Sequence, residues 1–429
     1  MKKSFYALIV AFMILISFVA HSFLFETGDT ITGIKDLFNK YFNNDEIIET
    51  KVFPELRFDY SFSEISINET EYYNYQHLNS LQQGMYKKLL DAAIKMKTGN
   101  IQLGAGTKKD AIIALYAMKY DHPDLFWLGF EYGIGEDDDN VYLRFDKGDF
   151  SGYTLTHDER EMMMSELKSE VEKILDECIT ADMTDFEKEV AIHDWICSNV
   201  IYDETAKDSE MIADNKRENP LPWTSYGAIV NRVAVCEGYS KAFQLLLYCV
   251  GINSNLVCGN VTDGSPHMWN TVMLDNDWYY VDVLWDDVEE ANVIHTFLNV
   301  DSDMISKTHT IFPDCSAVTD NEKIYSGEYN LKSPTTNSIK MNYYVIKGTV
   351  INSDDEFHNV VVENIIKAAD EGYDSVEFFY SYKEINENIV RFDIKNSRIF
   401  SAIKGQIADF KGFKYIAYSY GSFILKISR

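Results

Sequence analysis

Cys236 stands at the predicted start of a helix, where a thiol can become a nucleophile. The segment AVCEGYSKAFQLLLYCVGI (234–252) has an apolar stripe at helical spacing and a stop at Gly251, which predicts a core helix. The dipole and free N–H groups at a helix N-terminus favour a thiolate and can hold an oxyanion. Cys249 lies in the last turn, where the dipole opposes a thiolate, and Cys258 lies in an apolar strand. We expect Cys236 to react and the other two cysteines to be core residues.

A thiol nucleophile needs a base, and a histidine oriented by a carboxylate provides one. The sequence HMWNTVMLDNDWYYVDVLW, which begins at His267, reads as a strand, a turn and a returning partner strand. A loop of two or four residues pairs Leu274 with Asp277. Counting back then puts His267, Trp269 and Asp282 on one face, with Asp282 diagonal to His267. A three-residue loop would put Asp282 on the opposite face, so the hairpin register decides whether the two residues can meet.

These three residues also have ordinary structural interpretations. Cys236 could fill the core, His267 could be a surface or satisfied core residue, and Asp282 could cap a turn. Their order along the chain, on a helix start, a strand and its partner strand, favours a functional constellation.

Other polar and aromatic residues are weaker candidates for the same site. The backbone N–H of Cys236 is one oxyanion donor, and Tyr226 is either a second donor or a core tyrosine. Trp269 and Trp285 either wall a cleft or pack in the core. His193 is expected to pack or hydrogen-bond on a helix, and no role is assigned to His295 or His309.

Composition and charge exclude some functions. The chain has 429 residues with 39 Lys and Arg against 68 Asp and Glu, a net charge of −29 that argues against nucleic acid as a partner. Its six cysteines form no C-x-x-C pair, so no zinc site is expected. The acidic residues at 137–139 lack EF-hand spacing and read as a solvated turn. We expect neither a metal nor a cofactor.

The N-terminus resembles an export segment. Lys2 and Lys3 precede an apolar run from Phe5 to Ala20, as in a signal peptide or a membrane anchor. A weak small-x-small cleavage site follows at 20–22. We expect residues 1–25 to direct the rest of the chain to the outer face of the cytoplasmic membrane, either anchored or released.

The pattern along the chain predicts an α+β protein. Helices are expected over about 71–97, 108–120 and 156–178, and another opens with a capping box of Thr184 and Glu187. The C-terminal segment reads as strand Tyr343–Ile351, helix Phe357–Ala369, strand Ser375–Tyr380 and a strand pair over Lys414–Ile427. These elements suggest the following organisation: 26–55 a lead-in, 56–150 an N-terminal α+β region, 151–332 a catalytic core and 339–429 a small C-terminal α+β domain.

The motifs VCEGYSKAF, HMWNTV and WYYVDVLWDD together resemble the bacterial transglutaminase-core branch of the transglutaminase-like superfamily. The resemblance covers about residues 155–325. It implies a papain-like fold, in which a helix bearing the cysteine packs on an antiparallel sheet. It also implies that Cys236 is the nucleophile, His267 the general base and acid, and Asp282 the residue that orients the histidine. Many members have a threonine where this chain has Leu284, which puts one local hydrogen bond in doubt.

The expected activity is thiol-dependent acyl transfer on amide bonds of a protein or peptide, cell-wall peptide included. A thioester at Cys236 would be resolved by water, as in a peptidase or amidase, or by an amine, as in protein cross-linking. The residues do not choose between the two. The competing interpretation is a non-catalytic cell-surface binding module with the same fold.

Overall fold

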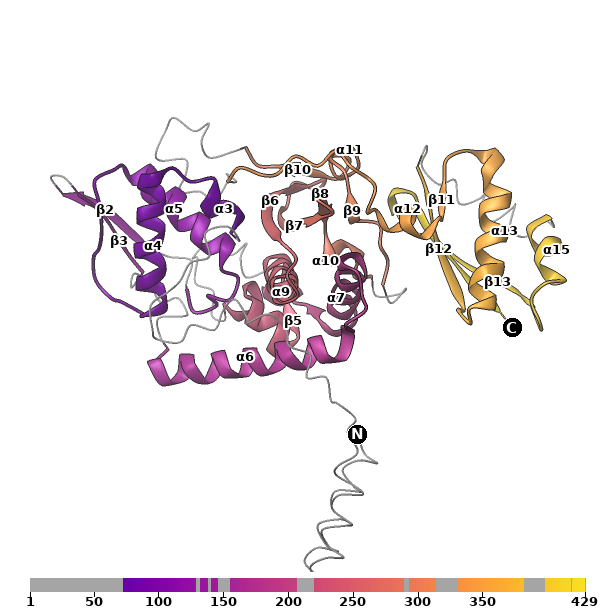
Figure 1. Cartoon of the computed structure of the whole chain (residues 1–429), viewed down its shortest axis with the longest axis horizontal. Helices are drawn as coiled ribbons and strands as arrows, with labels where there is room; N and C mark the ends of the chain where they lie inside the picture. Colours follow the sequence, from indigo (N-terminus) through magenta and orange to yellow (C-terminus); the bar gives the residue numbers. More distant parts are fainter. Residues whose placement is uncertain are drawn as a thin grey trace, which may run out of the picture. The chain divides into compact units, whose positions relative to one another are not determined.

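The computed structural model describes residues 72–128, 132–137, 140–145, 155–206, 220–288, 293–313, 331–381, 398–417 and 419–428 (Figure 1). These residues all belong to one compact unit that spans 53–429. The predicted export segment and lead-in lie outside the described residues. None of the described helices is both long and apolar enough to span a membrane.

The N-terminal region combines helices with a small antiparallel sheet. Its helices are α3 (Tyr73–Gln76), α4 (Ser80–Ile94) and α5 (Lys108–Asp121), and its sheet has the order β1-β3-β2 with β1 (Ile101–Gly104), β2 (Gly133–Asp137) and β3 (Asn140–Arg144). The single helix expected over 71–97 is interrupted, because Asn79 forms a capping box with Gln82 and starts α4 as a new helix.

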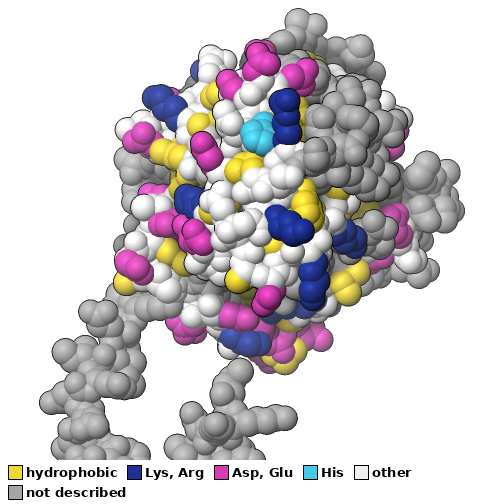
Figure 2. All heavy atoms as spheres, turned by 90° about the vertical axis from the view of Figure 1, so that its right-hand side faces the viewer, with side chains coloured by type: hydrophobic (Ala, Val, Ile, Leu, Met, Phe, Trp, Pro, Cys, Tyr) yellow, Lys and Arg dark blue, Asp and Glu magenta, His cyan; other side chains and the backbone are white. Residues whose placement is uncertain are grey.

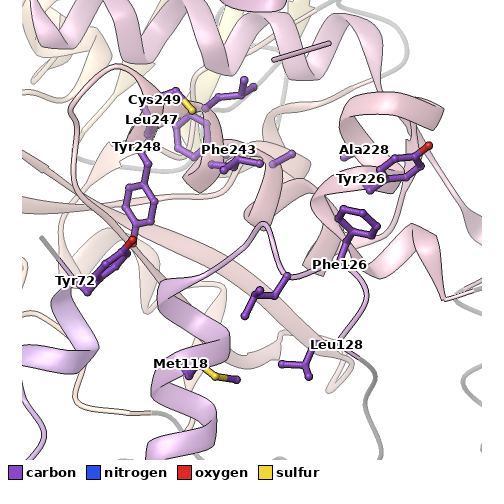
Figure 3. Close-up of a cluster of buried hydrophobic side chains, with 14 of the residues drawn as sticks. Tyr72, Met118, Phe126, Leu128, Tyr226, Ala228, Phe243, Leu247, Tyr248 and Cys249 are labelled. Atoms are coloured by element: carbon purple, nitrogen blue, oxygen red, sulfur yellow. The ribbon is translucent and has the colours of Figure 1, made fainter. Parts of the chain in front are cut away.

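Three longer helices form the middle of the chain. They are α6 (His157–Cys178), α7 (Asp185–Asn199) and α9 (Cys236–Cys249). The predicted capping box of Thr184 and Glu187 begins α7, and Gly251, with φ 84°, follows the end of α9. One hydrophobic cluster joins α9 to the N-terminal region, and Figure 3 shows Phe243 and Leu247 in the same cluster as Met118 and Phe126.

Helix α9 packs on a five-stranded antiparallel sheet with the order β10-β6-β7-β8-β9. In Figure 1, α7 and α9 lie between this sheet and α6. The strands are β6 (Ser254–Val261), β7 (Pro266–Leu274), β8 (Asp277–Val281), β9 (Leu298–Val300) and β10 (His309–Ile311). Short elements complete this part: β4 (Ile201–Tyr202), η2 (Leu221–Trp223), the π-helix η3 (Gly227–Asn231), β5 (Val233–Ala234), α10 (Val283–Asp286) and α11 (Ser302–Ile305).

The C-terminal residues form a separate four-stranded sheet with its own hydrophobic cluster. The sheet order is β11-β12-β14-β13, with β11 (Val350–Ile351), β12 (Ser375–Tyr380), β13 (Gly412–Ala417) and β14 (Ser422–Ser428). Helices α13 (Asp354–Asp370) and α15 (Arg398–Lys404) pack against each other, and both contribute to this cluster. On the face in Figure 2, basic, acidic and hydrophobic side chains are interspersed among the described residues.

One prediction for the C-terminal segment is wrong. Residues Tyr343–Lys347 form a helix, α12, where the sequence suggested a strand that continues to Ile351. Gly348 ends α12 in the left-handed conformation at φ 70°, and only Val350 and Ile351 then pair with β12. The two tyrosines of α12 read as strand formers because aromatic residues are common in strands. Here the ring of Tyr343 stacks on His295 and that of Tyr344 stacks on Phe379 of β12.

Candidate active site

Cys236 is the first residue of α9 and is partly exposed. The preceding residue, Val235, is the N-cap, and its side chain makes no hydrogen bond to the N–H groups of the first helical turn. A thiol at this position lies at the positive end of the helix dipole. The local structure therefore suits a thiolate and leaves N–H donors for a negatively charged oxygen.

Gly238 allows the segment before α9 to approach the start of this helix. A Cβ atom at Gly238 would lie 2.3 Å from the carbonyl oxygen of Pro222 and 2.8 Å from the Cβ of Ala234. The N–H of Val235 also donates to Pro222, at 3.0 Å. The segment around η2 thus holds the entrance to α9, and with it the position of Cys236.

The β7–β8 hairpin has the two-residue register on which the sequence argument depended. Leu274 pairs with Asp277, and the turn residues Asp275 and Asn276 have φ values of 50° and 64°. Positive φ at both positions is characteristic of the type I′ turn that matches the twist of a hairpin. Of the alternatives that the sequence left open, the structure thus has the loop that pairs Leu274 with Asp277, although β8 ends at Val281, before Asp282.

Asp282 uses its two carboxylate oxygens for two tasks. Its Oδ2 accepts a hydrogen bond from Nε2 of His267 at 2.6 Å, and its Oδ1 accepts from the N–H of Trp285 at 3.2 Å. The second contact makes Asp282 the N-cap of α10. The cap that the sequence analysis considered for Asp282 is therefore present, and it holds the carboxylate beside His267.

His309 joins this cluster, although the sequence analysis assigned it no role. Its Nε2 donates to the same Asp282 Oδ2 at 2.9 Å, while its Nδ1 is bonded to Thr308 Oγ1 at 2.7 Å. His309 lies on the edge strand β10, opposite Val261. Gly259 permits this approach, because a Cβ there would lie 2.2 Å from the carbonyl oxygen of Thr310. The sequence shows His309 only as a histidine near the end of the segment that resembles the family. No spacing pattern in the sequence relates it to Asp282.

The charges of this cluster reinforce one another. Burial disfavours the imidazolium of His267, but the Asp282 carboxylate and the Cys236 sulfur favour it, and together they raise the pKa of His267 to about 10. Burial also disfavours the Asp282 carboxylate, yet the two histidines hold the pKa of Asp282 well below its usual value. Because Nε2 of His267 faces Asp282, its Nδ1 is the nitrogen left for Cys236. The arrangement favours the charged, imidazolium form of His267 beside Cys236.

The tyrosine suggested as an oxyanion donor does not serve that purpose. The hydroxyl of Tyr226 donates to Glu166 of α6 at 2.6 Å, and its ring packs against Phe126 at 4.9 Å between centroids, as Figure 3 also shows. A phenol has a single proton to donate. Tyr226 is therefore a core residue with its polar end on α6, which leaves the backbone N–H groups of α9 as the oxyanion donors.

The two tryptophans differ in their surroundings. Trp269 is 0% exposed and packs beneath His267, with ring centroids 5.9 Å apart, so it is a core residue and cannot wall a cleft. Trp285 is only partly buried and lies 6.2 Å from His267 and 4.6 Å from His309 between ring centroids. Tyr420, from the short helical turn η6 (Ser419–Gly421) between β13 and β14, stacks on Trp285 at 5.7 Å. Trp285 is placed to border the site, with a residue of the C-terminal segment beside it.

Two groups of described residues bring potential metal ligands within 4.8 Å of one another. One is His267, Asp282 and His309, where both imidazoles already donate to one carboxylate oxygen and the other oxygen caps α10. The site around Cys236 is thus organised as a hydrogen-bonded cluster. The second group lies on other elements and is described below.

Comparison with known proteins points to one superfamily. Residues 172–283 match the family model of the transglutaminase-like superfamily. The chain is 16% identical to a transglutaminase of known crystal structure, over 36% of this chain and 44% of that one, with a TM-score of 0.26. It is 13% identical to a provisionally assigned cysteine protease from Cytophaga hutchinsonii, over 36% of this chain and 61% of that one, with a TM-score of 0.21. The chain thus spans less than two thirds of either protein, and no curated protein matches it significantly.

Proposed function

We propose that this protein performs thiol-dependent acyl transfer on amide bonds. The premise is that residues 172–283 form a domain of the transglutaminase-like superfamily with an α+β core. Cys236 is the nucleophile, His267 the general base and acid, and Asp282 the residue that orients the imidazole. The observation that carries the proposal is the 2.6 Å contact between His267 and Asp282, with the other side of the imidazole turned to Cys236 at an uncapped helix start.

The proposed reaction has two halves. The Cys236 thiolate attacks the amide carbonyl, and the oxyanion that forms accepts hydrogen bonds from the N–H groups of the first turn of α9. The C–N bond then breaks, and His267 donates its proton to the departing amine or ammonia, which leaves a thioester on Cys236. Water or a second amine then attacks the thioester while His267 accepts its proton. The C–S bond breaks, the carboxylic acid or new amide is released, and the Cys236 thiolate beside the His267 imidazolium is restored.

The substrate class follows from the nucleophile and from the proposed location. An amide substrate would be a protein or a peptide, with cell-wall peptide as one accessible source for an exported protein. Export is proposed from Lys2, Lys3 and the apolar run Phe5–Ala20, and it would place the enzyme outside the cytoplasmic membrane, anchored or released. Fractionation of cells that express the full chain and a variant lacking residues 1–25 would test the location.

Alkylation by iodoacetamide, followed cysteine by cysteine with peptide mass spectrometry, tests the proposed nucleophile. Cys236 should react at least roughly tenfold faster than Cys178, which is also partly exposed but lies at the other end of a helix. His267→Gln should remove this difference. If Cys236 reacts no faster than Cys178, the proposal fails, and the binding-module interpretation replaces it.

Hydrolysis and amine transfer are separated by assays run side by side. Release of ammonia or a peptide fragment without incorporation of a labelled primary amine indicates water as the acceptor, and incorporation indicates transfer. Cys236→Ala should abolish both signals, and Cys249→Ala provides a matched control, because Cys249 is a buried thiol at the opposite end of the same helix.

A further inference from the structure

A second histidine–carboxylate cluster lies away from Cys236, where α7 meets the chain before β9. His193 Nδ1 lies 3.0 Å from Asp194 Oδ1, and His295 Nε2 lies 3.0 Å from the same oxygen. The two imidazole rings are stacked, with centroids 5.4 Å apart. Three atoms that can each offer an electron pair, once the two nitrogens have lost their protons, therefore lie within 4.8 Å of one another.

Each of these histidines is held from behind by another carboxylate. His193 Nε2 lies 3.3 Å from Asp286 Oδ2, and His295 Nδ1 lies 2.8 Å from Glu377 Oε2 on β12. His193 Nε2 and His295 Nδ1 can each hold a proton for these contacts. In a neutral imidazole the lone pair is then on the other ring nitrogen, which is Nδ1 of His193 and Nε2 of His295. A carboxylate behind a histidine is the usual second-shell partner in metal sites, where it fixes the tautomer and strengthens the ligand.

The cluster also has an excess of negative charge. The three carboxylates Asp194, Asp286 and Glu377 face only two imidazoles, and no lysine or arginine among the described residues forms an ion pair with any of the three. Burial disfavours the charged form of a carboxylate. A bound cation would stabilise these carboxylates by supplying positive charge.

Access distinguishes this cluster from the one around Asp282. The side chain of Asp194 is 41% exposed, whereas that of Asp282 is 1% exposed. In addition, the second oxygen of Asp282 caps α10, and the Nδ1 of His267 faces Cys236. The cluster of His193, Asp194 and His295 therefore meets solvent at Asp194, while the side chains of its two histidines are 0% and 8% exposed.

We propose that His193 Nδ1, Asp194 Oδ1 and His295 Nε2 form a binding site for one divalent transition-metal ion, for which Zn²⁺ is the fitting probe. Two imidazoles and one carboxylate are a donor set that Zn²⁺ accepts with bond lengths of about 2.0–2.2 Å. Tetrahedral ligands at these lengths are roughly 3.4 Å apart, so the two 3.0 Å separations would open by a few tenths of an ångström. The sequence analysis expected no metal because it examined cysteine and EF-hand spacing, and this site uses neither.

The ion would tie the C-terminal sheet to the core. Glu377, which holds His295, also accepts from the backbone N–H of His295 at 3.0 Å and from the hydroxyl of Tyr344 on α12. The ring of Tyr343 stacks on His295 at 3.7 Å between centroids and an angle of 3°. Metal bound to His295 thus strengthens a junction between α7, the chain before β9 and the C-terminal segment.

Titration calorimetry with ZnCl₂ on the full, untagged, metal-stripped protein tests the site. We expect saturable binding of one ion per chain. Asp194→Asn and His295→Gln should each weaken it by at least about tenfold, and Glu377→Gln by roughly 10–100-fold. Asp185→Asn is the matched control, because Asp185 is an exposed acid on the same helix, paired with Lys188, and this variant should bind like the wild type. The absence of saturable binding, or equal binding by Asp194→Asn, overturns the proposal.

Substitution of Co²⁺ identifies which cluster holds the ion. Ligands from His193, Asp194 and His295 give visible d–d bands without a sulfur-to-cobalt charge-transfer band, and Cys236→Ala should leave the spectrum unchanged. A charge-transfer band that Cys236→Ala removes would place the ion at the other cluster and contradict the proposal. Asp194 is partly exposed, so Asp194→Asn should fold even if His295→Gln does not. Metal binding requires no catalysis, so this result and the alkylation of Cys236 are independent.

Discussion

The Nε2 atom of His309 lies 2.9 Å from Oδ2 of Asp282. This is the oxygen that His267 also contacts, so one carboxylate oxygen accepts from two imidazoles. With its other oxygen on the N–H of Trp285, Asp282 has no freedom to rotate away from His267. The orientation of the proposed base is therefore set by β10 and α10 as well as by its own hairpin.

Replacement of His309 tests this positioning role. His309→Gln should slow alkylation of Cys236 by roughly tenfold, because a hydrogen bond to a charged group is worth about 1.5–3 kcal/mol. The loss of one donor also makes Asp282 a stronger partner for His267, so the alkaline limb of the pH–rate profile should move to higher pH. A variant that loses stability but keeps the profile of the wild type would show that His309 is only structural.

The stability contributed by His267 should depend on pH in a defined window. The pKa of His267 is raised from 6.5 to about 10 in the folded protein, so the imidazolium stabilises the fold fully below about pH 6.5. This contribution declines as the pH rises and disappears above about pH 10. Denaturant unfolding of the wild type and His267→Gln from about pH 6 to about pH 10.5 should show a stability difference that narrows steadily. A difference that widens with pH would contradict the assigned charge.

The two tryptophans near the site should respond differently to truncation. Trp269→Ala should lower the free energy of unfolding by about 3–5 kcal/mol, because Trp269 fills the core beneath His267. Trp285→Ala should lower the free energy of unfolding by less. It should also raise the ratio of two labelling rates of Cys236, that of a bulky maleimide divided by that of iodoacetamide. Equal ratios in wild type and Trp285→Ala would mean that Trp285 does not border the access to the thiol.

Glycine-to-alanine substitutions at two helical positions can be compared. Gly238 lies in α9, the helix that carries Cys236, and Gly84 lies in α4. Gly238→Ala should destabilise the protein by about 1–3 kcal/mol, because its Cβ would meet the backbone of Pro222 at 2.3 Å. Gly84→Ala, in α4 with nothing within 4 Å of the new atom, should instead stabilise it by about 0.5–1 kcal/mol. Chemical denaturation measures both, and a neutral Gly238→Ala would show that the segment around η2 can shift without cost.

Local patterns in the sequence were sufficient for much of the fold. The capping box at Thr184 and the stop at Gly251 are short-range features, in which neighbouring residues determine the backbone. The sequence also placed a turn after Leu274, but only the structure decided that its loop has two residues, Asp275 and Asn276. The two-residue turn fixed the register of β7 and β8, and that register brought His267 close to Asp282. The motifs around Cys236, His267 and Asp282 were also enough to indicate the superfamily.

The remaining features depended on contacts between distant parts of the chain. Side-chain spacing could not show that Trp269 is buried or that the hydroxyl of Tyr226 is used by Glu166, since both depend on packing against other elements. The approach of His309 to Asp282 requires the pairing of β10 with β6, and no local pattern specifies a partner so far along the sequence. Thus the sequence by itself determined the three residues at the centre of the candidate site. Only the tertiary structure decided which other side chains surround them, because burial and long-range pairing are properties of the whole fold.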